Sequence, residues 1–218
     1  MPSMKMKSIA WSLLALNLTV TGIHGQEPYN LETELEQGRI KVLNRDIKVY
    51  GEAAGAVEMN AARGDGLAVL EGIGWSRGTI QLELLGENSP GRSFIGFAFN
   101  IVDQETYEAV YFRPFNFVAD EQERKDHMVQ YICHPDYTWS RLREERTGEF
   151  ENEIPAPPDP DGWFSVKIRV EEDRVEVYVE DRAEPVLAVE RLTRSESNAI
   201  GLWTGNGSSG RYRNLVVE

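Results

Sequence analysis

Residues 163–180 read WFSVKIRVEEDRVEVYVE, and this stretch decides the fold class. From 163 to 170 and again from 174 to 180, apolar and polar residues alternate one by one. That period belongs to a strand with one buried face. The acidic triplet Glu171-Glu172-Asp173 separates the two runs. The stretch therefore predicts a tight hairpin of two antiparallel strands whose valine ladders face a core.

Similar short segments recur along the chain from residue 39 to residue 217, separated by turn residues. Regular spacing of this kind, without long helical periodicity, predicts an all-β protein. We expect a two-sheet antiparallel β-sandwich that forms one domain over residues 39–218. Residues 26–38 are polar and are predicted to form an N-terminal arm or a short helix. Residues 138–151 also have helical character, although this segment is too short and too charged to cover a sheet.

The first 25 residues have the layout of a signal peptide. Lys5 and Lys7 precede a mainly apolar run at 9–20, and the small residue Gly25 follows. The apolar run is well short of the roughly 20 residues that a membrane-spanning helix needs. We expect residues 1–25 to be cleaved, the mature chain not to insert into a membrane, and the protein to be secreted or periplasmic.

Charge and cysteine content narrow the class of protein further. The net charge of −13 argues against binding of nucleic acid or anionic lipid, both of which require a positive surface, and it favours a neutral or cationic ligand. Cys133 is the one cysteine, so no internal disulfide can form. Within an aromatic-rich strand it is expected to be a small buried residue rather than a nucleophile.

The polar faces of four predicted strands, at 78–85, 93–102, 107–113 and 127–134, would form one patch if these strands are neighbours. The patch would contain Gln81, Glu83, Asn100, Tyr107, Tyr111 and Arg113. The last strand adds either Gln130 and His134 or His127 and Tyr131, depending on the register. Aromatic rings and amide groups suit sugar hydroxyls. The alternative interpretation is an ordinary solvated sheet face.

The longest irregular segment, residues 116–162, is expected to lie beside this patch. Long loops inside compact domains are usually functional or disordered. Trp139 and Arg143 within it, together with Trp163, could wall a pocket, whereas core packing is the alternative role for each tryptophan.

Three segments carry a resemblance to a known superfamily: SFIGFAFNIVDQETYEAVYFRPF (93–115), DGWFSVKIRVEEDRVEVYVED (161–181) and IGLWTGNGSSGRYRNLVV (200–217). Their content and order resemble the laminin-G-like bacterial branch of the concanavalin A-like lectin/glucanase superfamily, over about residues 75–218. The ending also resembles bacterial 3-keto-disaccharide hydrolase and family 16-like domains. The resemblance implies a jelly roll whose concave face binds or cleaves glycans. It implies no cofactor beyond a structural calcium ion in some members, for which Asp103 or Asp120 would be ligands.

Two patterns that suggest catalysis or metal binding are not supported by their context. Glu171, Asp173 and Glu176 have the E-x-D-x-x-E spacing of family 16 glucanases. They surround a hairpin tip, however, so they cannot all point onto a concave face. His127 and His134 are seven residues apart and fall on opposite faces of a strand, which makes them poor joint metal ligands. No metal site is predicted.

The sequence thus predicts a carbohydrate-binding protein whose ligand face centres on Tyr111 and Arg113. One alternative is a glycan-processing hydrolase that uses the same face, with Glu83 as general acid or base and His127 or His134 assisting. A second alternative is a non-catalytic surface interaction domain. Whether the protein is an enzyme is left open at this point.

Overall fold

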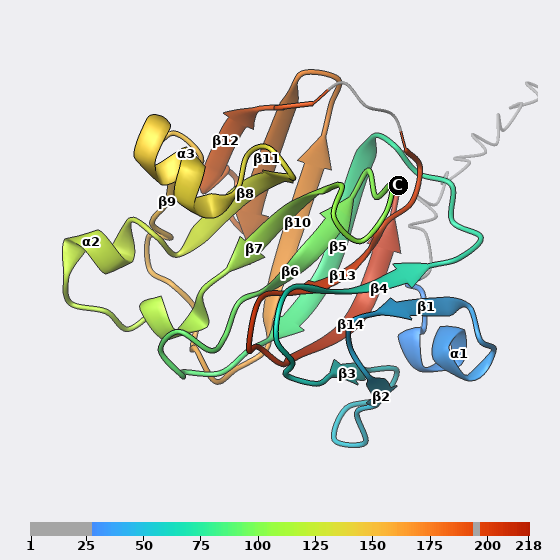
Figure 1. Ribbon diagram of the computed structural model, residues 1–218. Coiled ribbons are helices and arrows are strands. Elements are labelled where there is room, and N and C mark those ends of the chain that lie inside the picture. Colours follow the sequence, from blue (N-terminus) through green and yellow to red (C-terminus); the bar gives the residue numbers. More distant parts are fainter. Residues whose placement is uncertain (1–27, 194–196) are drawn as a thin grey trace, which may run out of the picture.

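The protein is a sandwich of two antiparallel sheets with seven strands each (Figure 1). The structure, a computed structural model, describes residues 28–193 and 197–218. The signal peptide predicted at 1–25 lies outside these residues. The prediction of an all-β, two-sheet antiparallel sandwich is confirmed.

The first sheet has the strand order β1-β4-β13-β6-β7-β8-β9 and the second has the order β12-β11-β10-β5-β14-β3-β2. The strands of the first sheet are β1 (Ile40–Leu43), β4 (Gly66–Leu70), β6 (Ile95–Phe99), β7 (Tyr107–Phe112), β8 (Val129–His134), β9 (Glu151–Asn152) and β13 (Gly201–Thr204). Those of the second are β2 (Ile47–Val49), β3 (Val57–Met59), β5 (Gly78–Leu85), β10 (Phe164–Val170), β11 (Arg174–Val179), β12 (Leu187–Glu190) and β14 (Gly210–Val217).

In the part of the chain that the structure describes, the helices are short: α1 (Leu31–Glu36), α2 (Gln122–Lys125), α3 (Trp139–Glu145) and the 3₁₀ turn η1 (Pro114–Asn116). Helix α1 occupies the predicted N-terminal arm, and α3 falls in the segment with helical character. In Figure 1, α2 and α3 lie at the end of the first sheet that carries β8 and β9. Across the described ranges, no helix is long and apolar enough to span a membrane.

The hairpin predicted at 163–180 is formed by β10 and β11. Val166 pairs with Val179 and Val170 with Val175, and the amide of Glu171 donates to the carbonyl of Arg174 across the turn. The valines of both strands are buried. The acidic residues therefore surround the tip of the hairpin, away from the first sheet, as the alternation predicts.

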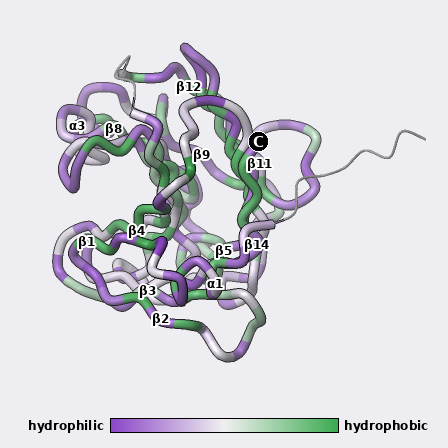
Figure 2. The backbone as a smooth tube through the Cα atoms, turned by 90° about the vertical axis from the view of Figure 1, so that its right-hand side faces the viewer, coloured by the Kyte–Doolittle hydropathy of each residue, from purple (hydrophilic) through white to green (hydrophobic). Residues whose placement is uncertain are grey.

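The core lies between the sheets and is filled by alternate residues of both. Phe97 and Phe112 contribute from the first sheet, and Ile80, Leu82 and Leu84 from the second. In Figure 2 the hydrophobic positions, in green, gather in the strands, whereas the connecting loops are mostly purple. The burial of these apolar side chains is the main contribution to the stability of the fold.

Strand β7 also buries a charged residue inside the core. Glu108 is fully buried, and Arg191 meets it with Nη2 at 2.7 Å from Oε2. The Tyr131 hydroxyl donates to the same carboxylate at 2.6 Å, and Asn100 Nδ2 donates at 2.8 Å. A buried charge is tolerated only when it is paired and hydrogen-bonded in this way.

The expectation that Asn100 shares the outer patch is wrong, and the alternative that placed Tyr131 there is excluded. Both side chains point inward to Glu108. Strand β6 ends at Phe99, and Asn100 adopts a left-handed backbone conformation with φ of 51°. Strand alternation therefore no longer sets the direction of its side chain.

The expectation that Gln81 and Glu83 join the patch is also wrong. Strand β5, which carries both, pairs with β10 and β14 in the second sheet. Glu83 forms an ion pair with Arg213 at 2.6 Å and accepts a hydrogen bond from Asn214 at 2.7 Å. Both predicted residues therefore lie on the opposite outer face of the sandwich from Tyr111.

Breaking the buried pair should cost far more stability than breaking an exposed one. We expect Glu108→Ala to lower the free energy of unfolding by about 3–5 kcal/mol, because it leaves the Arg191 charge buried and unpaired. The control Arg169→Ala, which removes a half-exposed pair with Glu171, should cost less than about 1 kcal/mol. Urea denaturation measures both. Equal losses in the two variants would contradict the role assigned to Glu108.

Candidate functional site

The outer face of the first sheet collects the side chains that alternate away from the core. Across β7 and β8, Tyr107 pairs with His134 and Tyr111 with Gln130. Directly opposed residues of an antiparallel pair share a face. The register therefore selects the Gln130 and His134 set of the two alternatives. His127 precedes β8 and reaches the same side from the connecting loop.

The floor of this face is a pair of aromatic rings brought together over a glycine. Trp203 on β13 and Tyr111 on β7 both pair with Gly96 on the strand between them. Their ring centroids are 4.9 Å apart. A Cβ at Gly96 would lie 2.1 Å from the carbonyl oxygen of Val110 and 2.6 Å from the Cα of Tyr111. Glycine is thus required for the close strand approach that positions the floor.

A pocket of about 500 Å³ lies above this floor. Phe94 stands edge-on to both Tyr111 and Phe115, with ring centroids 6.1 and 5.5 Å apart. The pocket is lined by Asp65, Gly91, Phe94, Tyr111, Arg113, Phe115, Asn116, Arg124, His127, Ile132, His134, Trp139, Arg143, Trp203, Gly205 and Asn206. Aromatic and apolar side chains make up about half of this lining and polar or charged side chains the other half, a combination that suits a ligand with both apolar and polar faces.

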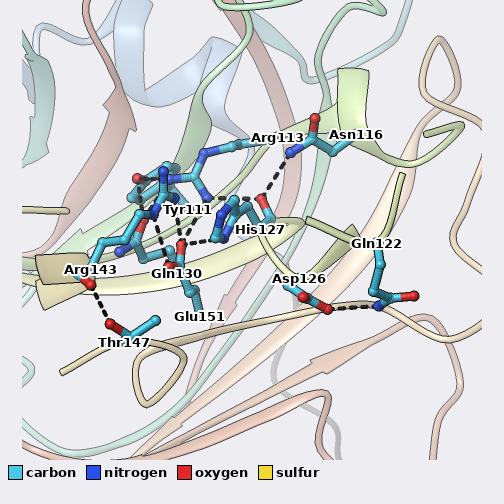
Figure 3. A network of polar contacts seen from close by, with 10 residues as sticks. All are labelled: Tyr111, Arg113, Asn116, Gln122, Asp126, His127, Gln130, Arg143, Thr147 and Glu151. Atoms are coloured by element: carbon cyan, nitrogen blue, oxygen red, sulfur yellow. Dashed lines mark hydrogen bonds and ion pairs between the residues drawn. The ribbon is translucent and has the colours of Figure 1, made fainter. Parts of the chain in front are cut away.

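A connected polar network closes one wall of the pocket (Figure 3). Arg113 is almost fully buried and donates to the Tyr111 hydroxyl at 2.6 Å, to Gln130 Oε1, and to the carbonyl of His127 at 2.8 Å. The Tyr111 hydroxyl in turn donates to Gln130 Oε1 at 2.7 Å. Burial raises the pKa of Tyr111 to about 12, so its hydroxyl keeps its proton and remains a donor near neutral pH.

Glu151 on β9 is the acidic member of this network. Arg143 from α3 holds both of its oxygens, with Nε 3.0 Å from Oε1 and Nη2 2.6 Å from Oε2. Arg113 Nη1 lies 3.9 Å from the same carboxylate. The hydrogen bonds to Glu151 are the main reason that the pKa of Arg143 is raised. One carboxylate thus links the floor of the pocket to helix α3.

His127 completes the network from the loop before β8. Its Nδ1 lies 2.9 Å from Glu151 Oε2, close enough for an ion pair but not aligned as a hydrogen bond. Desolvation lowers the pKa of His127, although the nearby Glu151 carboxylate opposes that shift. The ring is therefore harder to protonate than a free imidazole.

The mouth of the pocket carries the half-exposed ring of Trp139, at the start of α3. The Arg143 guanidinium lies 5.2 Å from the centroid of this ring. An exposed tryptophan at the rim of an aromatic pocket offers a flat apolar surface to a ligand. Trp163, by contrast, lies under Arg213 and against Tyr50, away from this pocket.

A second pocket of about 340 Å³ adjoins the first, and Asp65 and His134 line both. The Tyr107 hydroxyl donates to Asp65 at 2.8 Å and accepts from Trp203 Nε1 at 3.1 Å. His134 stacks on Tyr107 with ring centroids 5.0 Å apart. The two pockets together form an extended site with Asp65 at their junction.

Buried Arg45 holds the loops that make this junction. Its guanidinium donates to the carbonyls of Gly64 and Gly205 at 2.7 and 2.9 Å, and to the hydroxyl of Thr204 at 2.9 Å. A Cβ at Gly66 would lie 2.2 Å from the Arg45 side chain. Asp65 is therefore set at the junction by an arginine that itself lines neither pocket.

Most of the site residues predicted from the sequence lie together on the outer face of the first sheet. The structure brings together Tyr107, Tyr111, Arg113, His127, Gln130, His134, Trp139 and Arg143. The sequence did not single out Trp203, Phe94, Asp65, Glu151 or Arg124 as site residues. Trp203 joins the site through the pairing of β13 with β6, and Glu151 through the pairing of β9 with β8. Arg124 comes from helix α2, and Phe94 directly precedes β6.

The calcium site that the resemblance implied gains no ligand set here. Within residues 28–193 and 197–218, no group of three or more His, Cys, Asp or Glu residues is arranged to hold a metal ion. Asp103 Oδ1 accepts a hydrogen bond from the amide of Glu105 at 2.8 Å within its own turn.

Comparison with known proteins gives a result at the level of fold. No known family model matches the chain, and no curated protein sequence matches it. Among solved structures it is similar to the carbohydrate-binding module CBM66 from Bacillus subtilis, with a TM-score of 0.57, 16% identity, and coverage of 81% of this chain and 93% of the module.

Two further structures show the same likeness. A Bacillus subtilis protein with a galectin-like fold has a TM-score of 0.55 at 9% identity, over 85% of this chain and 91% of that one. The potassium-bound carbohydrate recognition domain of Emp46p has a TM-score of 0.53 at 10% identity, over 87% and 94%. The chain therefore has the concanavalin A-like lectin/glucanase fold that the sequence resemblance implied.

The glycine under the aromatic floor is open to a direct test. Gly96→Ala should lower the free energy of unfolding by about 1–3 kcal/mol, because the new methyl group overlaps the backbone of β7. The control Gly51→Ala adds a methyl group where no atom lies within 4 Å, and it should have little effect. Thermal and urea denaturation measure both variants. A Gly96→Ala protein as stable as the parent would show that the strands can separate without cost.

Proposed function

We propose that the protein binds a carbohydrate on the outer face of the first sheet, with a sugar ring seated over Tyr111 and Trp203. The observation that carries this proposal is the aromatic floor of a pocket whose walls hold arginine, histidine and asparagine side chains. Sugar rings present apolar C–H faces to aromatic rings and hydroxyls to polar donors and acceptors. Two of the similar structures support the proposal, because they are described as a carbohydrate-binding module and a carbohydrate recognition domain.

The proposed face would be the concave face of the jelly roll, and the proposed location is secreted or periplasmic, as the N-terminal sequence suggests. A pocket on the concave face would meet glycans that lie outside the cell or in the periplasm. The long segment 116–162, which the sequence marked as functional, supplies Trp139 and Arg143 to the mouth of the pocket.

A glycan-processing hydrolase on the same face is the alternative proposal. Among the described residues that line the larger pocket, Asp65 is the one carboxylate, and Glu151 is sequestered by Arg143. Glu83, the acid or base expected from the sequence, lies on the other sheet. The arrangement therefore favours binding over retaining hydrolysis, which requires two carboxylates about 5 Å apart.

A surface interaction domain is supported least. Among described residues, the exposed large hydrophobic side chains are those of Val49, Val102, Val118 and Trp139. They come from separate segments, and single exposed apolar residues are ordinary for a soluble protein.

The proposal is tested by screening the purified protein against plant and algal polysaccharides and 3-keto glycosides, with binding and released product recorded together. Trp139→Ala should weaken binding of the best glycan by about tenfold, because it removes a stacking surface without disturbing a buried contact. The matched control Trp163→Ala removes a tryptophan from the opposite face and should leave affinity unchanged. Absence of binding to every glycan would refute the proposal, whereas product release would favour the hydrolase.

A further inference from the structure

The larger pocket is rich in arginine, although the protein as a whole is strongly acidic. The whole chain has a net charge of −13. Yet the described residues that line this pocket include the three arginines Arg113, Arg124 and Arg143, and one carboxylate, Asp65. Glu151 and Glu121 contact these arginines from outside the lining, so the pocket itself presents mainly guanidinium N–H donors, in contrast to the acidic composition of the whole chain.

The guanidinium group of Arg113, beside the aromatic floor, is contacted mainly by neutral groups. The Arg113 side chain is 6% exposed, and its guanidinium lies 4.8 Å from the ring centroid of Tyr111 and 5.8 Å from that of Phe94. Its hydrogen-bond partners are a hydroxyl, an amide oxygen and a backbone carbonyl. None of these carries a negative charge, so its charge is balanced only through Glu151.

Glu151, however, is shared between two arginines. Arg143 takes both of its oxygens, and Arg113 Nη1 stays 3.9 Å from it. Arg113, Arg143 and Glu151 together carry one net positive charge. An incompletely balanced charge in a partly desolvated site is costly. An anion bound in the pocket would complete the balance.

Two of the arginines have donors that a ligand can reach. The side chain of Arg143 is 32% exposed, and its pair with Glu151 uses Nε and Nη2 but not Nη1. The side chain of Arg124 is 42% exposed at the pocket, where it donates to the carbonyl of Phe115 and meets Glu121 at 3.5 Å. Guanidinium groups bind carboxylates and sulfates through charge-assisted N–H donors.

We infer that the glycan bound in this pocket is acidic, with a carboxylate or sulfate ester on the sugar facing Arg143 and Arg124 while its ring lies over the aromatic floor. This inference rests on the proposed function and specifies its ligand class. The negative charge elsewhere on the protein does not oppose it strongly. At physiological ionic strength, exposed charges beyond a Debye length of about 8 Å are largely screened.

The test uses matched pairs of oligosaccharides that differ only in their charge. Oligogalacturonides are compared with their carboxyl-reduced forms, and sulfated galactan oligosaccharides with their desulfated forms, by isothermal titration calorimetry. In at least one pair the acidic member should bind about tenfold or more tightly, as expected for one additional charge-assisted pair. Which pair shows the preference distinguishes a carboxylate from a sulfate.

Two variants of one helix separate the pocket from general surface charge. Arg143→Gln should reduce the preference for the acidic member to less than about threefold. The control Arg141→Gln removes an equal charge from α3 at a residue that pairs with Glu145 instead, and it should leave the preference intact. In the unaltered protein, raising NaCl from about 50 to about 500 mM should weaken the acidic member selectively, which tests the inference even if Arg143→Gln does not fold.

Equal affinity for the acidic and neutral members of the pairs that bind would overturn the inference and leave the proposed function standing. The same holds if Arg141→Gln and Arg143→Gln lower the preference equally. Failure of every oligosaccharide, acidic or neutral, to bind either here or in the polysaccharide screen would instead count against the proposed function itself.

Discussion

Strand β7 is buried on both of its faces, and this constraint organises the molecule. A strand with period two must send alternate side chains to opposite sides. Every residue of β7 is buried, so its polar groups need partners within the protein. Glu108 therefore needs Arg191 within the core, and Tyr111 and Arg113 need Gln130 outside it. The packing that joins the two sheets and the network that shapes the pocket thus depend on opposite faces of β7 and of Arg113, the residue that follows it. A disturbance of one side is expected to reach the other.

Local patterns in the sequence predicted much of this arrangement. The alternation at 163–180 predicted a hairpin with its acidic residues around the turn, because period and turn chemistry act between neighbours in the chain. The outward direction of Tyr107, Tyr111 and Arg113 followed in the same way. The choice of sheet did not. Gln81 alternates as expected, but between residues 85 and 95 the chain crosses to the other layer, and no local signal records that crossing.

The parts of the site that the sequence missed are those assembled over long distances. Trp203 meets Tyr111 only because β13 and β7 flank the same glycine. Arg45 reaches Gly205 across 160 positions of the chain to position the loop of Asp65. The net charge of the chain favoured a neutral or cationic ligand, whereas the arginines of the pocket favour an acidic one, and the reason for the difference is similar. A net value sums the whole surface, whereas the arginines of the pocket are separated along the chain and are brought together by folding.

Cys133 gives the protein an internal reporter of its own motions. It is the one thiol of the chain, it lies buried in β8, and burial raises its pKa to about 12. The thiolate is the form that attacks thiol reagents, so both inaccessibility and the shortage of thiolate protect this residue while the sheet is closed. Its rate of labelling under native conditions therefore measures how often β8, a strand of the pocket, separates from its neighbours. No cysteine has to be introduced by mutation to measure this rate. Slower labelling of Cys133 with a glycan present would show that occupation of the pocket stabilises the sheet against opening.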